Sequence, residues 1–149
     1  DGAEKNNLIQ QAEGMSLENI TFLPSVKKEL VNEYINISDL ALVNLKKTDT
    51  FKKIIPSKIF ENVAMKKPIL LGVEGEAKDL IEKYNVGVCY EPENEDSFHE
   101  ALEKILQFED NKMNFEKACE NMINDFDRTK LASQMLDVIT DECFNNNSK

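Results

Sequence analysis

The segment FKKIIPSKIFENVAMKKPIL, residues 51–70, places a proline, a serine, a lysine and a glutamate where an amphipathic helix pattern begins. Pro56 is not tolerated inside a helix and Ser57 is a good N-cap, so the helix is expected to start at Lys58. Unpaired backbone N–H groups, the positive end of the helix dipole, the Ser57 hydroxyl and the Lys58 ammonium would then meet in one place. Such a combination is typical of a phosphate site. The helix is expected to bury one stripe: Ile59, Phe60, Val63 and Ala64.

Glu61 lies one turn further along, on the same polar side of the helical wheel as Lys58. A carboxylate there would repel a phosphate, but it suits the two hydroxyl donors of a neighbouring sugar. The pattern therefore predicts a site for a nucleoside diphosphate with its ribose. The alternative is that Lys58 and Glu61 form an ordinary i, i+3 surface pair, which would contribute about 0.2–0.5 kcal/mol.

Lysines gather around this helix start in a chain that is otherwise acidic. Residues 46–67 hold seven lysines against Asp49 and Glu61, a local charge of +5. The whole chain carries −10, so the other residues together carry −15. A positive island on a negative molecule would concentrate a small anion locally. A lysine-rich surface loop without a ligand is the alternative that composition leaves open.

The bulk properties exclude several classes of protein. With 149 residues and 41% hydrophobic residues, the chain suits one globular domain of common size. Its net charge argues against nucleic acid as the main partner, because a phosphate backbone would be repelled. No apolar run approaches the roughly 20 residues that span a bilayer. The three cysteines have neither CxxC nor Cys/His spacing, so we expect reduced thiols, no metal site and a cytoplasmic location.

Short apolar runs alternate with amphipathic segments along the chain. Strands are expected at 19–23, 39–45, 68–73 and 86–90. Helices are expected at 4–13, 26–37, 58–66, 76–84, 96–107, 111–124 and 128–143. The run DLALVNL, residues 39–45, is apolar almost throughout and is expected to be buried on both sides. The alternation predicts an α/β fold, a Rossmann-like parallel sheet with flanking helices, whose ligands bind beyond the carboxyl ends of the strands.

We expect residues 1–149 to form a single nucleotide-sugar-binding lobe that closes with C-terminal helices at 111–145. The chain opens with Asp1-Gly2, a turn dipeptide of the kind that follows a strand. Four strands are also few for a doubly wound sheet. We therefore expect the lobe to be truncated at its N-terminus, with one or two further strands upstream.

The segment IPSKIFENVAMKKPILLGVEGEAKDLIE resembles the donor-binding segment of the family-four retaining glycosyltransferases, which have the two-lobed GT-B fold. It is most similar to the PSK-type members, which often build capsular or O-antigen polysaccharide. DGAEKNNLIQQA, LENITFLPSVKKELVNEYINISDLALVNL and the terminal FDRTKLASQMLDVI are similar to further family segments, in the family's order. No single segment is specific, but their order and spacing together are.

The resemblance implies roles for particular residues. Glu61 matches the glutamate that hydrogen-bonds the nucleotide ribose, and Pro56, Ser57 and Lys58 match the diphosphate contacts. Ser25, with its neighbours Pro24 and Val26, matches the loop that borders the base. Gly75 and Glu76 match a glycine-bearing loop with a glutamate near the next helix, where Glu76 more readily acts as a helix cap.

The family often carries a second glutamate eight positions before the first, in contact with the donor sugar. Here that position is Lys53. PSK-type relatives commonly lack this glutamate, so the departure puts the sugar contact in doubt but does not exclude activity. The family's diphosphate-binding arginine and lysine, and the acceptor lobe with its histidine, have no counterpart in this sequence, so no catalytic residue is assigned here.

The resemblance thus implies the C-terminal, donor-binding lobe of a retaining enzyme that transfers a hexosyl or N-acetylhexosaminyl group to a polysaccharide or lipid-linked acceptor. The donor would be a UDP or GDP sugar, without a metal or other cofactor. The parent would work in the cytoplasm, at the inner face of the membrane where its acceptor is lipid-linked. Without the acceptor lobe we expect the chain itself to be inactive. A UDP-N-acetylglucosamine 2-epimerase-like lobe and a non-catalytic α/β interaction module are the alternative functions.

Overall fold

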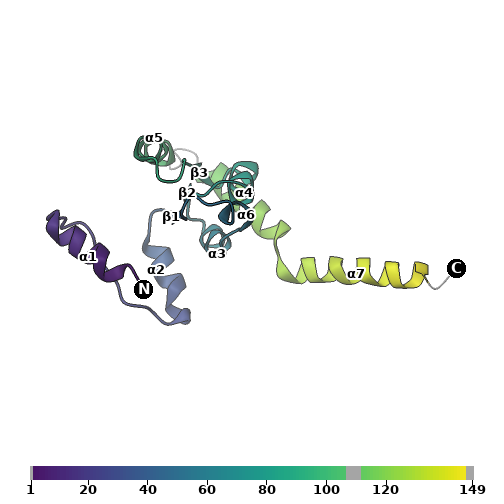
Figure 1. The fold of residues 1–149 in the computed structure, drawn as a ribbon. Helices are drawn as coiled ribbons and strands as arrows, with labels where there is room; N and C mark the ends of the chain where they lie inside the picture. Colours follow the sequence, from purple (N-terminus) through teal and green to yellow (C-terminus); the bar gives the residue numbers. More distant parts are fainter. Residues whose placement is uncertain (1, 107–111, 147–149) are drawn as a thin grey trace. The chain divides into compact units, whose positions relative to one another are not determined.

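The structure is a computed structural model that describes residues 2–106 and 112–146, except for the side chains of 142–146. The chain divides into two compact units, Asp1–Glu33 and Tyr34–Lys149. Figure 1 labels the helices and strands along the chain. The predicted helix end at Gln107 and helix start at Asn111 lie outside the described residues.

The first unit contains helix α1, Lys5–Gly14, and a 3₁₀ turn, Lys28–Leu30. The chain between them is irregular, and Lys5 Nζ donates a hydrogen bond to the Leu23 carbonyl at 2.8 Å. The predicted strand at 19–23 is wrong, because a strand exists only when its backbone pairs with a neighbour and this segment joins no sheet. The predicted helix at 26–37 is replaced by the 3₁₀ turn and the shorter helix α2, Val31–Ile37.

The second unit is built on a three-stranded parallel sheet. Its strands are β1 (Ala41–Asn44), β2 (Ile69–Gly72) and β3 (Gly87–Cys89), in the order β1-β2-β3. The register sets Leu42 opposite Leu70 and Leu70 opposite Val88. Helices α3 and α4 make the two crossovers, because parallel strands cannot be joined by tight turns. The predicted α/β class with a parallel sheet is therefore confirmed.

The position of β1 at the edge of the sheet explains why its predicted burial is wrong. All four residues of the central strand β2 are buried. In β1, by contrast, Val43 is buried while Leu42 is 51% exposed. The expected burial of this strand on both sides is wrong, since β1 is the edge of the sheet in the described chain and α5 packs mainly against β2 and β3.

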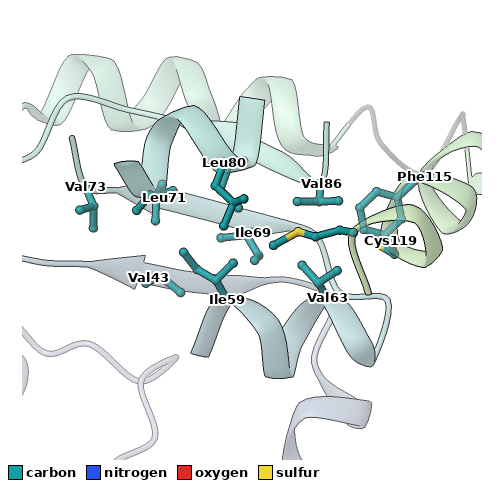
Figure 2. Packing of buried hydrophobic residues seen from close by; sticks show 13 residues of the cluster. Val43, Ile59, Val63, Ile69, Leu71, Val73, Leu80, Val86, Phe115 and Cys119 are labelled. Carbon is teal, nitrogen blue, oxygen red and sulfur yellow. The ribbon is translucent and has the colours of Figure 1, made fainter. Parts of the chain in front are cut away.

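Helices cover the two faces of the sheet unequally. Helices α3 (Lys58–Ala64), α4 (Glu76–Tyr84) and α6 (Lys112–Asp125) share one core with the β2 side chains Ile69 and Leu71. Figure 2 shows Ile59 and Val63 of α3 and Leu80 of α4 packed around those side chains. Leu70 points to the opposite face, because side chains alternate along a strand, and packs against α5 (Glu95–Leu106). The main core therefore lies directly beneath α3 and fixes its position.

Helix α7, Arg128–Asn146, follows α6. Its described apolar side chains are exposed, among them Leu131, Met135 and Ile139. Among the described residues, no helix combines the length and the apolar character that crossing a membrane requires.

Candidate functional site

Three loops leave the carboxyl edge of the sheet, the edge at which ligands bind in parallel α/β folds. Residues 45–57 follow β1, residues 73–75 follow β2 and residues 90–94 follow β3. The first of these loops is the longest and contains a 3₁₀ turn, Phe51–Lys53, before it enters α3. The loop after β2 enters α4. Residues 56–61, 75 and 76 thus lie at the starts of two helices on one face of the sheet.

The backbone at the start of α3 keeps fewer open donors than expected. The N–H of Ile59 donates to the Pro56 carbonyl at 3.0 Å, and the N–H groups of Phe60 and Glu61 donate to the Ser57 carbonyl at 3.1 and 3.4 Å. Ser57 is the N-cap, as predicted, but its hydroxyl makes no capping hydrogen bond. Within the described chain, the N–H groups of Ser57 and Lys58 are left without a partner. The tip therefore offers two amides, a hydroxyl and an ammonium.

Lys58 and Glu61 are both exposed, and they do not form the i, i+3 ion pair that was the alternative interpretation. Among the described residues neither side chain has a hydrogen-bond or ion-pair partner. An exposed surface pair would stabilise the chain little in any case. Both side chains are free to meet a ligand.

A buried asparagine sets the rotation of α3. The buried residues of the helix are Ile59, Asn62 and Val63. Asn62 Nδ2 donates to the Lys58 carbonyl at 2.8 Å, which satisfies the amide inside the core. The predicted stripe is wrong at Ala64, which is exposed, whereas Phe60 is half-buried and packs against the core. With Asn62 turned inward, Lys58 and Glu61 face the solvent.

Gly75 begins α4 in a conformation that side chains rarely adopt, with φ +76° and ψ −140°. A Cβ at this position would collide with the carbonyl oxygen of Lys52, so the loop after β2 lies directly against the loop after β1. Gly75 is the N-cap, and Glu76 is the first residue of the helix. Glu76 is therefore not the cap, although its charge complements the positive end of the helix dipole.

Two lysines of the loop after β1 are held by carboxylates at the carboxyl edge. Lys47 Nζ lies 2.6 Å from Glu91 Oε1 and 3.9 Å from Glu74 Oε1. Lys52 Nζ lies 3.0 Å from Asp49 Oδ1 and 3.5 Å from Glu74 Oε2. The hydrogen bond to Glu91 raises the pKa of Lys47, and the same bond lowers the pKa of Glu91. The pair of Lys47 and Glu91 therefore stays charged near neutral pH.

The positive island expected at 46–67 is partly offset by such contacts. Besides Lys47 and Lys52, Lys66 Nζ pairs with Glu116 at 3.1 Å and with Glu120 at 2.9 Å. Lys67 Nζ donates to the Asn36 carbonyl at 2.7 Å. Within the described chain, the lysines of this segment that keep no partner are Lys46, Lys53 and Lys58. Of these three, Lys58 lies on the helix that also carries Glu61.

The remaining sequence-predicted position, Ser25, is exposed and belongs to the first unit. Sequence reasoning missed Asn62 and the ion pairs of Glu74 and Glu91. A signal existed for the latter, because glutamates follow β2 and β3 while lysines follow β1, and the ends of neighbouring parallel strands meet at one edge. Among the described residues, no cluster of His, Cys, Asp and Glu side chains is arranged to hold a metal ion.

A protein-family model matches most of the chain. The family described as "Glycosyl transferases group 1" matches residues 1–123, which include the sheet, α3, α4, α5 and most of α6. No curated protein matches the chain, and no solved structure matches it either.

Proposed function

The chain belongs to the group 1 glycosyl transferases, and we propose that it is the lobe that binds the nucleotide-sugar donor of a retaining GT-B enzyme. Transferases of this kind move a sugar from an activated donor to an acceptor. The proposed donor is a UDP or GDP sugar, and the proposed acceptor is a growing polysaccharide or a lipid-linked saccharide. The PSK-type family-four members are the relatives whose sequence pattern supports this finer assignment.

One observation carries the proposal: the start of α3 presents partnerless donors and a partnerless carboxylate at the carboxyl edge of the sheet. Ser57 and Lys58 offer two amides, a hydroxyl and an ammonium for the diphosphate. Glu61, one turn deeper and also exposed, offers an acceptor for the two ribose hydroxyls. Donors at the helix tip with an acceptor behind them match the order of groups along a nucleoside diphosphate.

The same groups account for a contribution to catalysis. As the bond between sugar and diphosphate breaks, negative charge grows on the departing diphosphate. Donors that are already in place stabilise this charge without reorganising. Pro56 fixes the backbone entering the helix, because its ring restricts φ. In this account Gly75 lets the loop after β2 approach closely, and Glu76 begins α4 beside it.

A titration followed by amide chemical shifts tests the proposal. The 149-residue chain would be titrated with UDP, GDP, ADP and inorganic pyrophosphate. We expect UDP or GDP to perturb the amides of Ser57, Lys58 and Glu61 progressively at millimolar concentrations, and pyrophosphate to perturb Ser57 and Lys58 more than Glu61. If no nucleotide perturbs these amides, the donor-binding role is wrong, and a non-catalytic interaction module becomes the better account.

A further inference from the structure

The first part of the loop between β1 and α3 is held by ion pairs and a hydrogen bond to the loops that follow β2 and β3. The side chain of Lys47 reaches Glu91 at 2.6 Å and, at 3.9 Å, Glu74. Its backbone N–H donates to Glu93 Oε1 at 3.2 Å. The loops after β2 and β3 therefore both hold the third residue after β1.

The same loop is fastened again in its middle. Lys52 Nζ lies 3.5 Å from Glu74 Oε2, so Glu74 bridges the two lysines. The Lys52 carbonyl also packs against Gly75 so closely that no side chain would fit. Of the carboxylates that pair with these lysines, Glu74 is the least exposed. The 3₁₀ turn that leads into Pro56 is thus held against the start of α4.

The carboxylate at the β3 end is itself held in place. Glu91 accepts a hydrogen bond from Asn94 Nδ2 at 3.0 Å, and its N–H donates to Ser97 Oγ at 2.9 Å. Asn94 Oδ1 in turn accepts the N–H of Ser97 at 3.0 Å. The hydrogen bonds with Asn94 and Ser97 orient Glu91 independently of Lys47. The Glu91 carboxylate is therefore already in position to pair with the lysine.

The net charge around Lys47 and Lys52 indicates that these lysines hold the loop in place and do not bind an anion. Lys47 and Lys52 face four carboxylates, those of Asp49, Glu74, Glu91 and Glu93. The cluster is therefore net negative, and a diphosphate would be repelled from it. These two lysines do not suit the role of phosphate ligands, although they are among the lysines nearest the carboxyl edge.

We propose that Glu74 and Glu91 are positioning residues: through Lys52 and Lys47 they hold the loop of residues 45–57 closed against the carboxyl edge and so set the start of α3. The consequence for ligand binding rests on the proposed function, because Ser57 ends this loop and Lys58 begins α3, and without these contacts both would be presented to the donor in many orientations. A long loop with only one short turn of its own needs such external contacts to be ordered.

The test compares the double variant Glu74→Gln, Glu91→Gln with a matched control, Glu82→Gln, Glu100→Gln. The control removes two exposed carboxylates that pair with lysines on their own helices, at 3.7 and 3.8 Å. Backbone amide hydrogen exchange at residues 46–57 is the first readout. We expect exchange there to rise by about three- to tenfold in the test variant and to stay unchanged in the control. Unchanged exchange in the test variant would overturn the proposal.

Two further measurements sharpen the result. Raising the salt concentration from about 0.05 M to about 1 M should accelerate the same amides in the wild-type chain, because salt screens exposed pairs. Exchanging the charges in Lys47→Glu, Glu91→Lys should give slower exchange near residue 47 than Lys47→Glu alone, which a general loss of stability would not allow.

Nucleotide affinity is the separate readout that distinguishes the two proposals. If the wild-type chain binds UDP or GDP, the test variant should bind it several-fold more weakly and the control variant equally well. Equal affinity in the test variant would show that the fastened loop does not position the donor groups. If the wild-type chain binds no nucleotide, the donor-binding role fails, while the exchange data still decide whether the carboxylates hold the loop.

Discussion

The residues at the start of α3 have different proposed roles: Lys58 supplies a positive charge and Glu61 a hydrogen-bond acceptor. Lys58 and Glu61 face solvent because Asn62 occupies the buried side of the helix and bonds the Lys58 carbonyl. Sequence patterns identified Lys58 and Glu61 from their types and spacing. They could not identify Asn62, because a polar residue on an amphipathic helix is expected outside and only the folded backbone reveals its hydrogen bond.

Truncating these two side chains should have different effects on different ligands. Lys58→Ala should weaken binding of UDP and of pyrophosphate alike, by about tenfold, because a charge-assisted contact to phosphate is lost. Glu61→Ala should weaken UDP by a similar factor and leave pyrophosphate unchanged or slightly tighter. Isothermal titration calorimetry measures both.

The matched controls are Lys104→Ala and Glu100→Ala, which remove an ion pair on α5. They should leave both affinities unchanged. An equal loss of UDP and pyrophosphate binding in Glu61→Ala would contradict its ribose role.

Glycine is required at position 75 by the positive φ of the backbone there and by the close approach of the Lys52 carbonyl. Gly75→Ala should lower the free energy of unfolding by about 1–3 kcal/mol for its backbone strain, with the collision against the Lys52 carbonyl adding to this loss. Gly14→Ala is the control, because the space around Gly14 is open and alanine reduces the entropy of the unfolded chain. Urea unfolding should show opposite effects for the two variants, and equal stability would contradict the strained geometry.

The two described thiols should be unreactive in the folded chain. Burial raises the pKa of Cys89 to about 12 and that of Cys119 to about 11. Both are free cysteines, whereas the side chain of Cys143 lies outside the described residues. In a Cys143→Ser background, a disulfide reagent at pH 8 should therefore label the folded chain far more slowly than the urea-unfolded chain. Rapid labelling of Cys119 would contradict its burial.

The same shifts give a pH dependence. Each thiol holds its proton more tightly when folded, so its stabilising contribution is complete below the unfolded pKa of about 8.5. It is lost as pH rises toward the folded pKa values of about 11 and 12. The free energy of unfolding should fall above about pH 9 by less in a Cys89→Ala, Cys119→Ala variant than in the wild type.

At the scale of elements, the sequence predicted best where local signals and burial agree. Helix α4 has its predicted bounds because Gly75 precedes it and Asn85 ends it in the left-handed conformation with φ +55°. The central strand β2 is apolar and is buried throughout. The segment at 19–23 has the composition of a strand, but composition cannot supply the partner that a strand needs.

The burial of an apolar side chain predicts how much stability is lost when that side chain is shortened to alanine. Ile59→Ala should cost about 2–5 kcal/mol, because Ile59 is fully buried between α3 and the sheet. Leu42→Ala should cost far less, because Leu42 on the edge strand is half exposed. Chemical denaturation of both variants measures the difference. Equal losses would contradict the assignment of β1 as an edge in this chain.

At the scale of the whole molecule, an overall charge of −10 coexists with lysines clustered in one segment. Composition revealed the cluster but could not show that three of its seven lysines pair with carboxylates, because these pairs join residues up to 54 positions apart in the sequence. Family membership, over residues 1–123, agrees with the predicted fold class. What distinguishes the candidate site is therefore the partnerless tip of α3 rather than the lysine content of its surroundings.

A crystal structure of the chain with bound UDP or GDP would test the central claim most directly. The account predicts the diphosphate at the amides of Ser57 and Lys58 with the ribose hydroxyls donating to the Glu61 carboxylate. A nucleotide bound at another edge of the sheet, or a diphosphate held by Lys47 and Lys52 with Glu61 turned to bulk solvent, would contradict it.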